Sequence, residues 1–352
     1  MKYLSKIIIA ILILNQTVSL AQNAQYEIFD KSYVPNSLQT ELQLVNNFGN
    51  INLVVWEKNS IQVTITLDVE GYDEKEVKKI LEKIDLKTAE TAGLISVKTN
   101  LKSYNSSSRK KTFKINYQVK MPDGHPLSID NEFGNIFLTD YSGKSTVNLE
   151  YGNLIAGNLK LLNLSHEFGK GEIESIEQGK FNLSYVDGFS LHTANQLQLT
   201  AEFSKVEIKK ITSILFDLEY GNLSVEEVSN YDGEAEFSGI SIGKVHENFE
   251  LDAEYANGTI EINLVSKDIK SFQLSTEFSK SEIRIESGAN FTFESEHSFG
   301  KLKTEGSSIN FTERIKDMSD ESYRGTIGNQ TQNIKTTLKI DTEYGGCTII
   351  AE

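Results

Sequence analysis

The sequence predicts an all-β protein, a parallel β-solenoid (β-helix) with coils of about 17–18 residues, capped by an N-terminal αβ segment with one amphipathic helix. The main observation is an aromatic residue that recurs at this spacing in a constant local setting. A fixed period is the signature of stacked repeats rather than of a globular enzyme. The recurring aromatics are Phe133, Tyr151, Phe168, Tyr185, Phe203, Tyr220, Phe237 and Tyr255, followed at wider spacing by Phe278 and Phe299.

Each copy of the repeat has the pattern of a half-buried strand. Val147, Leu149 and Tyr151 alternate with polar residues, which indicates one apolar face and puts the aromatic on the inward side. After Gly152 and Asn153 the apolar parity shifts by one residue. Because Gly and Asn tolerate positive φ, we expect them to form the corner between two strands.

Stacking such units along an axis buries a continuous column and pairs every strand edge except the last ones. Equivalent residues, about 4.8 Å apart, then form ladders, including an inward aromatic ladder. An antiparallel meander or a propeller would show the same alternation. A repeat of about 35 residues also stays open, because a large residue stands two positions before Tyr (Leu149, Leu218) and a small one before Phe (Ala201, Ala235).

We expect five segments along the chain. They are a signal peptide at 1–21, an N-terminal αβ cap with the first strand repeat at 22–126, the solenoid repeats at 127–312, a polar insertion at 313–332, and a final repeat or C-terminal cap at 333–352. The motif returns after the insertion at 343–345. Caps are expected because the bare ends of a solenoid expose unpaired backbone groups.

The first residues have the features of a secretory signal. Lys2 and Lys6 flank the start of an apolar run at 7–14, and small residues at 19–21 fit a cleavage site. The run is far shorter than the roughly 20 residues of a spanning helix. We therefore expect an exported mature chain without a membrane span, in the periplasm or at the cell surface or outside the cell.

The predicted cap segment differs from the repeats in its pattern of apolar and charged residues. Apolar residues at helical spacing (Val77, Ile80, Leu81 and Ile84) predict an amphipathic helix over 73–85. Strands are expected near 53–56, 61–69, 94–99 and 113–119, and a polar loop at 104–111.

Charge and cysteine content limit the possible partners. The formal charge of -15 becomes -17 when Lys2 and Lys6 are removed with the signal, which argues against a nucleic-acid partner because phosphates require basic surface. Cys347 is the one cysteine, so no intrachain disulfide can form.

We nominate no catalytic, cofactor-binding or metal-ligating residue, and no cofactor. The five histidines, none in a metal-ligand spacing, are His125, His166, His192, His246 and His297. His166 and His297 share the inward parity beside a Phe, which indicates buried structural histidines. No outward column of Asp is evident of the kind that β-helical enzymes acting on acidic polysaccharides use.

A column of glutamates is expected on the outer face. Glutamate precedes most of the aromatics, so stacking would place like charges about 5 Å apart. Lys170, Lys205 and Lys280 follow Phe copies by two residues and could pair with the column. The alternative is that the column collects divalent cations. The glutamates are Glu132, Glu150, Glu167, Glu202, Glu219, Glu236, Glu254 and Glu277.

Several short motifs in a fixed order carry a family resemblance. They are N-F-G-N-I at 47–51, V-W-E-K-N at 55–59, the helix E-K-E-V-K-K-I-L at 74–81, V-K-M-P-D at 119–123 and the repeated E-[FY]-G-[NK] units. Together they resemble the putative adhesin family of exported β-strand-repeat proteins, akin to autotransporter-adhesin head domains. The resemblance covers essentially the whole mature chain and implies a β-helical envelope protein without a known catalytic centre.

The leading functional hypothesis is a non-enzymatic, structural or binding module of the cell envelope. Its partner would be a glycan or an envelope protein. Two alternatives stay open: a polysaccharide-active lyase or hydrolase on the same scaffold, and a periplasmic scaffold or sensing partner of a membrane complex.

Overall fold

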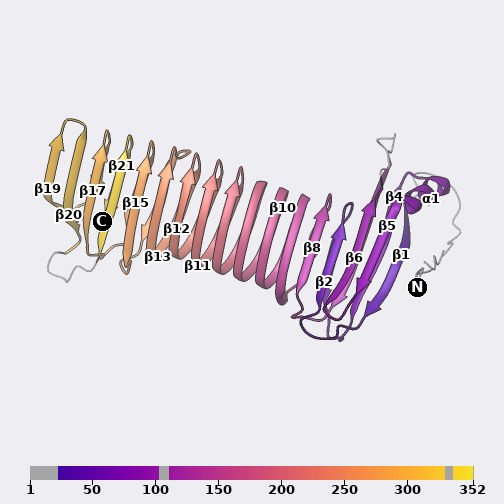
Figure 1. Ribbon diagram of the computed structural model, residues 1–352. Coiled ribbons are helices and arrows are strands. Elements are labelled where there is room, and N and C mark those ends of the chain that lie inside the picture. Colours follow the sequence, from indigo (N-terminus) through magenta and orange to yellow (C-terminus); the bar gives the residue numbers. More distant parts are fainter. Residues whose placement is uncertain (1–22, 103–110, 330–335, 352) are drawn as a thin grey trace. The chain divides into compact units, whose positions relative to one another are not determined.

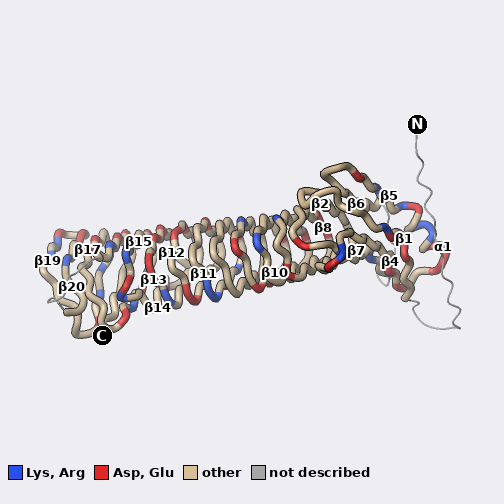
Figure 2. Tube along the Cα trace, turned by 90° about the horizontal axis from the view of Figure 1, so that it is seen from below, with Lys and Arg blue, Asp and Glu red and all other residues tan. Residues whose placement is uncertain are grey.

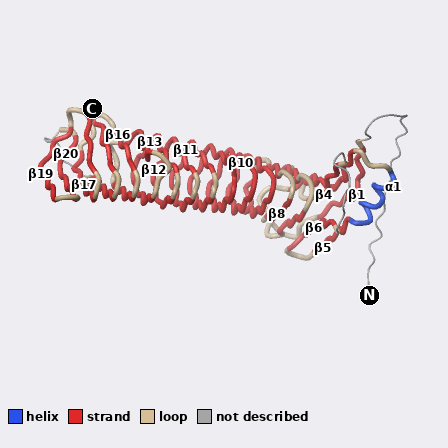
Figure 3. Tube along the Cα trace, turned by 90° about the horizontal axis from the view of Figure 1, so that it is seen from above, coloured by secondary structure: helices blue, strands red, loops and turns tan. Residues whose placement is uncertain are grey.

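The computed structural model describes residues 23–102, 111–329 and 336–351. The predicted signal peptide and most of the predicted loop at 104–111 lie outside these residues. The chain forms two compact units, residues 1–161 and 162–352, which we call unit 1 and unit 2. The described elements are strands apart from one short helix (Figure 3), so the predicted all-β class is confirmed.

Unit 1 combines antiparallel and parallel strands. The antiparallel pairs are β1–β4, β4–β7 and β5–β6. The elements are β1 (Ala24–Tyr33), β2 (Glu41–Asn46), β3 (Ile51–Val55), β4 (Ile61–Glu70), α1 (Glu74–Lys83), β5 (Ile84–Glu90), β6 (Leu94–Leu101), β7 (Thr112–Met121), β8 (Leu127–Glu132), β9 (Ile136–Leu138) and the first part of β10 (Tyr141–Glu202).

The predicted amphipathic helix is present as α1. It begins after Asp73, whose carboxylate accepts a hydrogen bond from the Glu76 backbone N–H, while the Glu76 carboxylate accepts from the Asp73 N–H. This reciprocal capping satisfies two backbone donors that the first turn would leave unpaired. Val77 and Ile80 lie on the buried face of the helix, as the spacing of apolar residues predicts.

In unit 1 the first repeat is out of sequence order. β2 pairs in parallel with β6 on one edge and β8 on the other, and β3 does the same with β7 and β9. β2 and β3 thus lie between strands that follow them in the sequence, and a buried polar network joins the three layers. The Asn46 amide donates to the Asn131 side-chain oxygen at 3.1 Å and to the Ile115 carbonyl at 3.0 Å. These bonds satisfy polar groups that burial would otherwise penalise.

Unit 2 holds the rest of β10 and twelve further strands. They are β11 (Lys205–Glu219), β12 (Asn222–Glu236), β13 (Gly239–Glu254), β14 (Thr259–Val265), β15 (Ser271–Glu277), β16 (Lys280–Ile285), β17 (Phe291–Ser298), β18 (Lys301–Glu305), β19 (Ile309–Asp317), β20 (Asp320–Ile327), β21 (Thr337–Glu343) and β22 (Gly346–Ala351).

Successive repeats of unit 2 pair in parallel and in register. Glu202 lies opposite Glu219, which lies opposite Glu236, and Glu236 opposite Glu254, so each register step equals one repeat. This pairing excludes an antiparallel meander for β11 to β16. Alternate side chains of each strand, such as Phe216 and Leu218, are buried and form the apolar interior that a repeat cannot build alone.

The C-terminal part of unit 2 departs from sequence order. β21 and β22 lie between two earlier pairs, β15 with β16 on one side and β17 with β18 on the other (Figure 1). β19 and β20 form an antiparallel hairpin that begins at Ile309, before the predicted polar insertion at 313–332, and β20 also pairs antiparallel with β17. The domain boundaries proposed from sequence stay predictions.

The corner residue is the aromatic itself, which corrects two expectations. All ten recurring aromatics, and Tyr344, have positive φ, between 48° and 56°. Because the chain turns at this residue, the ring points outward, and these eleven residues are 38–60% exposed. The predicted inward aromatic ladder is wrong, because the alternation of inward and outward side chains stops one position before the aromatic. The prediction that Gly152 and Asn153 have positive φ is also wrong.

Glycine after the aromatic has a steric role instead. A Cβ on Gly152 would lie 1.9 Å from the Gly134 carbonyl oxygen of the neighbouring repeat, and one on Gly345 would lie 1.9 Å from the Ser279 carbonyl oxygen. Neighbouring corners are therefore too close for a side chain at these positions.

The neighbouring corners at Tyr220 and Phe237 differ in how their interior is packed. Where Leu218 precedes the aromatic by two positions, Gly221 follows it, and a Cβ there would lie 2.8 Å from the Leu218 methyl group. Where the small Ala235 precedes, Ser238 follows, and both are buried. At these two corners, size at one position compensates size at the other. The Tyr185 repeat does not follow this rule, because the buried Leu183 precedes the aromatic and the buried Val186 follows it.

Candidate binding face

The outward side chains of β11, β12, β13, β15, β21 and β17 form a surface that we call the acidic face. The segments 213–219, 230–236, 248–254, 271–277, 337–343 and 292–298 of these strands carry thirteen carboxylates and, among Lys and Arg, Lys339 alone. Figure 2 marks the Asp and Glu positions in red. The carboxylates are Asp217, Glu219, Asp232, Glu234, Glu236, Glu250, Asp252, Glu254, Glu277, Asp341, Glu343, Glu294 and Glu296.

Register arranges these carboxylates in columns. Asp217 lies opposite Glu234, which lies opposite Asp252. Asp232 lies opposite Glu250 in a second column. Neighbouring members are separated by about 4.8 Å, the ordinary spacing of paired strands. An outward acidic column therefore exists beside the predicted glutamates, and sequence reasoning missed it because Asp and Glu interchange along it.

The predicted glutamate column is confirmed as a register feature in unit 2 and, for Glu132 and Glu150, in unit 1. The expected pairing with lysine does not hold at Lys205, whose ammonium bonds the Glu207 carboxylate at 3.0 Å. Among the residues that the structure describes, no group of three or more His, Cys, Asp or Glu is arranged to hold a metal ion.

Repulsion within the acidic face affects Asp341. Partial burial is the larger cause and the nearby Glu296 charge the smaller one, and together they raise the pKa of the Asp341 carboxyl above its usual range. Glu294 is better compensated, since the Arg324 guanidinium lies 3.5 Å from its carboxylate. The acidic face is thus a surface of net negative potential, which selects the charge sign of anything that approaches it.

The strands that follow each aromatic carry balanced charge. Ion pairs join Lys210 to Glu227 at 3.4 Å and Arg284 to Glu282 within hydrogen-bonding distance. The Lys267 backbone N–H donates to the Glu286 carboxylate, and the Lys244 ammonium lies 3.0 Å from it, so the pKa of the Glu286 carboxyl is lowered. The net negative charge is therefore concentrated on the acidic face.

The aromatic rings of unit 2 form a stack beside the glutamate column. Consecutive rings from Phe168 to Tyr255, then Phe278, Tyr344 and Phe299, have centroids 4.7–5.0 Å apart and planes within 3–9°. Because each ring face is covered by the next ring, the stack presents ring edges to solvent. The edges carry positive partial charge, which favours neighbouring carboxylates. Because the faces are covered, rings in the interior of the stack have no open face on which a sugar could stack.

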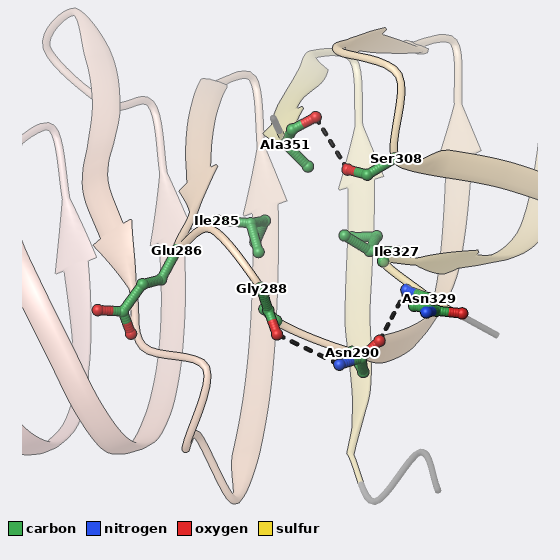
Figure 4. A pocket seen from close by; sticks show the side chains of 10 residues that line it. Ile285, Glu286, Gly288, Asn290, Ser308, Ile327, Asn329 and Ala351 are labelled. Carbon is green, nitrogen blue, oxygen red and sulfur yellow. Dashed lines mark hydrogen bonds between the residues drawn. The ribbon is translucent and has the colours of Figure 1, made fainter. Parts of the chain in front are cut away.

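A small pocket of about 370 Å³ lies near the C-terminal end of unit 2 (Figure 4). Its polar groups are engaged locally: Asn290 donates to the Gly288 carbonyl and accepts from the Asn329 N–H at 2.7 Å, and Ser308 donates to the Ala351 carbonyl. The Glu286 side chain points away from the other lining side chains. The lining therefore offers no converging acid and base.

The histidines are dispersed through both units. His166 and His297 are buried, as expected from their parity. Ser295 Oγ lies 2.6 Å from His297 Nε2, and burial lowers the pKa of the His297 imidazole to about 4, although Glu321 opposes this. His192 lies 3.0 Å from Glu174 and His246 lies 3.9 Å from Glu227. His125 is buried against the Thr40 carbonyl.

These residues define an all-β repeat protein with long columns of equivalent outward side chains. No helix in the described part of the chain is long and apolar enough to cross a membrane. No protein-family model matches the chain, and no curated protein matches it.

Solved structures do match. A putative cell adhesion protein from Clostridium sporogenes is 12% identical, with a TM-score of 0.20, over 94% of this chain and 100% of its own. A putative adhesin from Bacteroides fragilis is 8% identical (TM-score 0.28, 91% and 96% covered), and one from Parabacteroides distasonis is 9% identical (0.35, 94% and 97%). All three carry adhesion names, as does the family that the sequence resembles. At these TM-scores and identities, function has to be inferred from this chain's own geometry.

Proposed function

We propose that this chain is an exported, non-enzymatic β-solenoid that acts as an adhesin-like binding module of the cell envelope. In-register parallel repeats around an apolar interior support the solenoid. The basic and apolar pattern of residues 1–21 supports export. The three solved structures that match are named as a putative cell adhesion protein and putative adhesins.

The acidic face is the observation that carries the binding role. Each of six neighbouring paired strands contributes one to three of its carboxylates, so a partner would be held along an extended surface rather than in a cleft. Complementary charge favours a glycan that bears amino groups, or a basic region of an envelope protein, and disfavours acidic polymers.

Binding to glycans of different charge tests this proposal. The mature chain, residues 22–352, is immobilised and exposed to neutral, acidic and amino-bearing polysaccharides at low and high salt. The triple variant Asp217→Asn, Glu234→Gln, Asp252→Asn removes one acidic column, and we expect it to bind the amino-bearing polymer about 10-fold more weakly.

A matched control removes the same charge elsewhere. The variant Glu172→Gln, Glu226→Gln, Glu261→Gln changes three exposed carboxylates on strands that follow the aromatic, and we expect its binding to stay within about twofold of the parent. Equal losses in both triple variants would refute a role for the acidic face. New reducing ends or unsaturated products in any polysaccharide would refute the non-enzymatic assignment.

Export is tested separately. Residues 1–30 are fused to a reporter enzyme that is active only after export, and the matched control replaces Ile8 and Leu12 by Asp to interrupt the apolar run. Reporter activity from the first fusion and its loss in the second are expected; equal activity from both contradicts the signal peptide.

A further inference from the structure

The last repeat of the chain occupies an internal position in unit 2. β21 pairs in parallel with β15 on one edge and with β17 on the other. β22 pairs in the same way with β16 and β18. The strands that precede this repeat in sequence, β17 and β18, therefore lie beyond it in the stack (Figure 1).

β17, β18, β19 and β20 lie on the side of the C-terminal repeat that faces away from β15 and β16. We call these four strands the end module. Among the described residues, its strands pair only with one another and with β21 and β22. The ladder of backbone hydrogen bonds that joins the end module to β15 and β16 thus runs through the C-terminal repeat.

The C-terminal repeat contacts both neighbours in the same manner. The Tyr344 ring stacks on Phe278 and on Phe299, with centroids 4.8 Å away in each case. The Tyr344 N–H donates to the Ser298 carbonyl at 2.9 Å, and the Phe278 N–H donates to the Glu343 carbonyl at 2.9 Å.

The same repeat also fills the interior between its neighbours. Leu338 and Ile340 of β21 and Cys347 and Ile349 of β22 are buried. Opposite them in register lie Phe272 and Leu274 of β15, and Ser281 and Ile283 of β16. On the side of the end module, Thr292 Oγ1 lies 2.7 Å from Thr337 Oγ1. Without this repeat the buried side chains on both sides would lose their partners.

We propose that the C-terminal repeat is a lock: the end module docks on the preceding repeats only when β21 and β22 are inserted. The physical reason is that every strand edge joining the two parts belongs to the inserted pair. An incomplete chain therefore leaves the end module undocked and the edges of β15 and β16 open, and open edges invite pairing with other chains. This inference does not depend on the proposed binding role.

Hydrogen exchange measured by mass spectrometry tests the lock. The full mature chain is compared with a chain that ends at Thr336, and exchange is followed in β17, β20, β11 and β12. We expect exchange in β17 and β20 to become about 100-fold faster in the shortened chain, with β11 and β12 within about threefold of the parent. Unchanged exchange in β17 and β20 would overturn the proposal.

Because removal of two strands could unfold all of unit 2, a second comparison uses full-length chains. Gly345→Ala places a Cβ 1.9 Å from the Ser279 carbonyl oxygen, whereas Gly346→Ala, its matched control, meets nothing closer than the Lys301 carbonyl oxygen at 3.2 Å. We expect Gly345→Ala to speed exchange in the end module at least about 10-fold and Gly346→Ala by no more than about threefold. Equal effects of the two variants, or equal acceleration in β11, would overturn the lock.

Discussion

The backbone N–H of Gly221 donates a hydrogen bond to the hydroxyl of Ser238, 3.0 Å away in the neighbouring repeat. The same hydroxyl donates to the Glu236 carbonyl at 2.7 Å. Ser204 and Ser279 make equivalent pairs of bonds, with the N–H groups of Val186 and Ala256 and the carbonyls of Glu202 and Glu277. In every second repeat from Phe203 to Phe278, a serine thus satisfies an N–H of the preceding corner.

Replacing Ser238 by Ala should destabilise unit 2 by about 1–3 kcal/mol, because the buried Gly221 N–H loses its acceptor. The control is Ser241→Ala, three residues along: Ser241 is half-buried, and its hydroxyl makes no hydrogen bond that the described structure records. Urea unfolding of both variants measures the difference. If Ser241→Ala cost as much as Ser238→Ala, the hydroxyl ladder would have no special role.

The positive-φ aromatics predict an unusual order of substitutions at Tyr220. The ring stacks on Phe203 at 5.0 Å and on Phe237 at 5.0 Å, while φ is 51°. Tyr220→Ala loses the stacking and keeps a backbone conformation that costs an L-residue roughly 1–2 kcal/mol. Tyr220→Gly loses the same stacking but removes that strain. We expect the glycine variant to be the more stable of the two by about 1 kcal/mol.

Chemical denaturation of the two Tyr220 variants at the same pH and salt gives the comparison. The corresponding pair at Phe216, a buried strand residue without positive φ, is the control, and there alanine should be the better tolerated. The same order at both sites would mean that backbone strain at the corner is negligible.

The periodic spacing of apolar residues made most of the strands predictable. The corner was not predictable, because an aromatic residue there adopts positive φ. Val147 and Leu149 alternate as strand residues do, and both are buried; the helix at 74–83 followed from Val77 and Ile80. The outward turn at Tyr151 could not be foreseen, because aromatic residues seldom adopt positive φ and only stacking between repeats offsets the cost. Insertion of β21 between β15 and β17 was equally hidden, since all repeats share one pattern and pattern alone does not order them.

The acidic face was missed for a related reason. Asp217, Glu234 and Asp252 each stand three residues before an aromatic, but the residue type changes from one copy to the next. The glutamates beside the aromatics were found because the residue type there is constant.

Like charges on the acidic face should make stability depend on salt. Members of a column face each other across paired strands, and such pairs are each destabilising by roughly 0.2–1 kcal/mol. We expect the melting temperature to rise with sodium chloride, because salt screens exposed charges. The triple variant Asp217→Asn, Glu234→Gln, Asp252→Asn should melt higher at low salt and respond less to added salt.

Differential scanning calorimetry across a salt series measures this dependence. The triple variant Glu172→Gln, Glu226→Gln, Glu261→Gln is the control, and its salt response should resemble that of the parent. A parent protein that melts at one temperature over the whole series would contradict repulsion on the acidic face.

His297 should make the end module sensitive to acid. Burial lowers the pKa of its imidazole to about 4 from an ordinary value of 6.5, so protonation favours the unfolded state. The neutral ring contributes full stability above pH 6.5, and this is lost as the pH falls from about 6.5 towards 4, by roughly 3 kcal/mol at most. His297→Gln should remove this loss.

Hydrogen exchange in β17 at pH 7.5 and pH 4.5, corrected for the intrinsic exchange rates, follows the effect locally. The carboxyl of Glu321, whose pKa is lowered mainly by its bond to Lys316, also loses stabilising interactions in acid, but at lower pH. His246→Gln, at the surface of unit 2, is the control. If His297→Gln kept the parent's full loss of protection between the two pH values, protonation of this ring would not be the cause.

A disulfide at the lock provides the last prediction. Ser281 of β16 lies opposite Cys347 of β22, and both side chains are buried. Paired strands hold Cα atoms about 5 Å apart, within the range that a disulfide spans. Ser281→Cys should therefore form a disulfide with Cys347 on oxidation and stabilise the chain by about 4 kcal/mol, because it closes a long loop in the unfolded state.

The rate of this oxidation should report on the lock itself. Burial raises the pKa of the Cys347 thiol to about 12, so little reactive thiolate is present while β22 is paired. We therefore expect the disulfide to form slowly, at the rate at which β22 separates from β16 and β18. Non-reducing electrophoresis and melting with and without reductant measure both effects. Ser275→Cys, on the outer side of β15 opposite Asp341, is the matched control and should gain neither bond nor stability. A reduced Ser281→Cys chain after prolonged oxidation would show that β22 does not lie against β16 in this register.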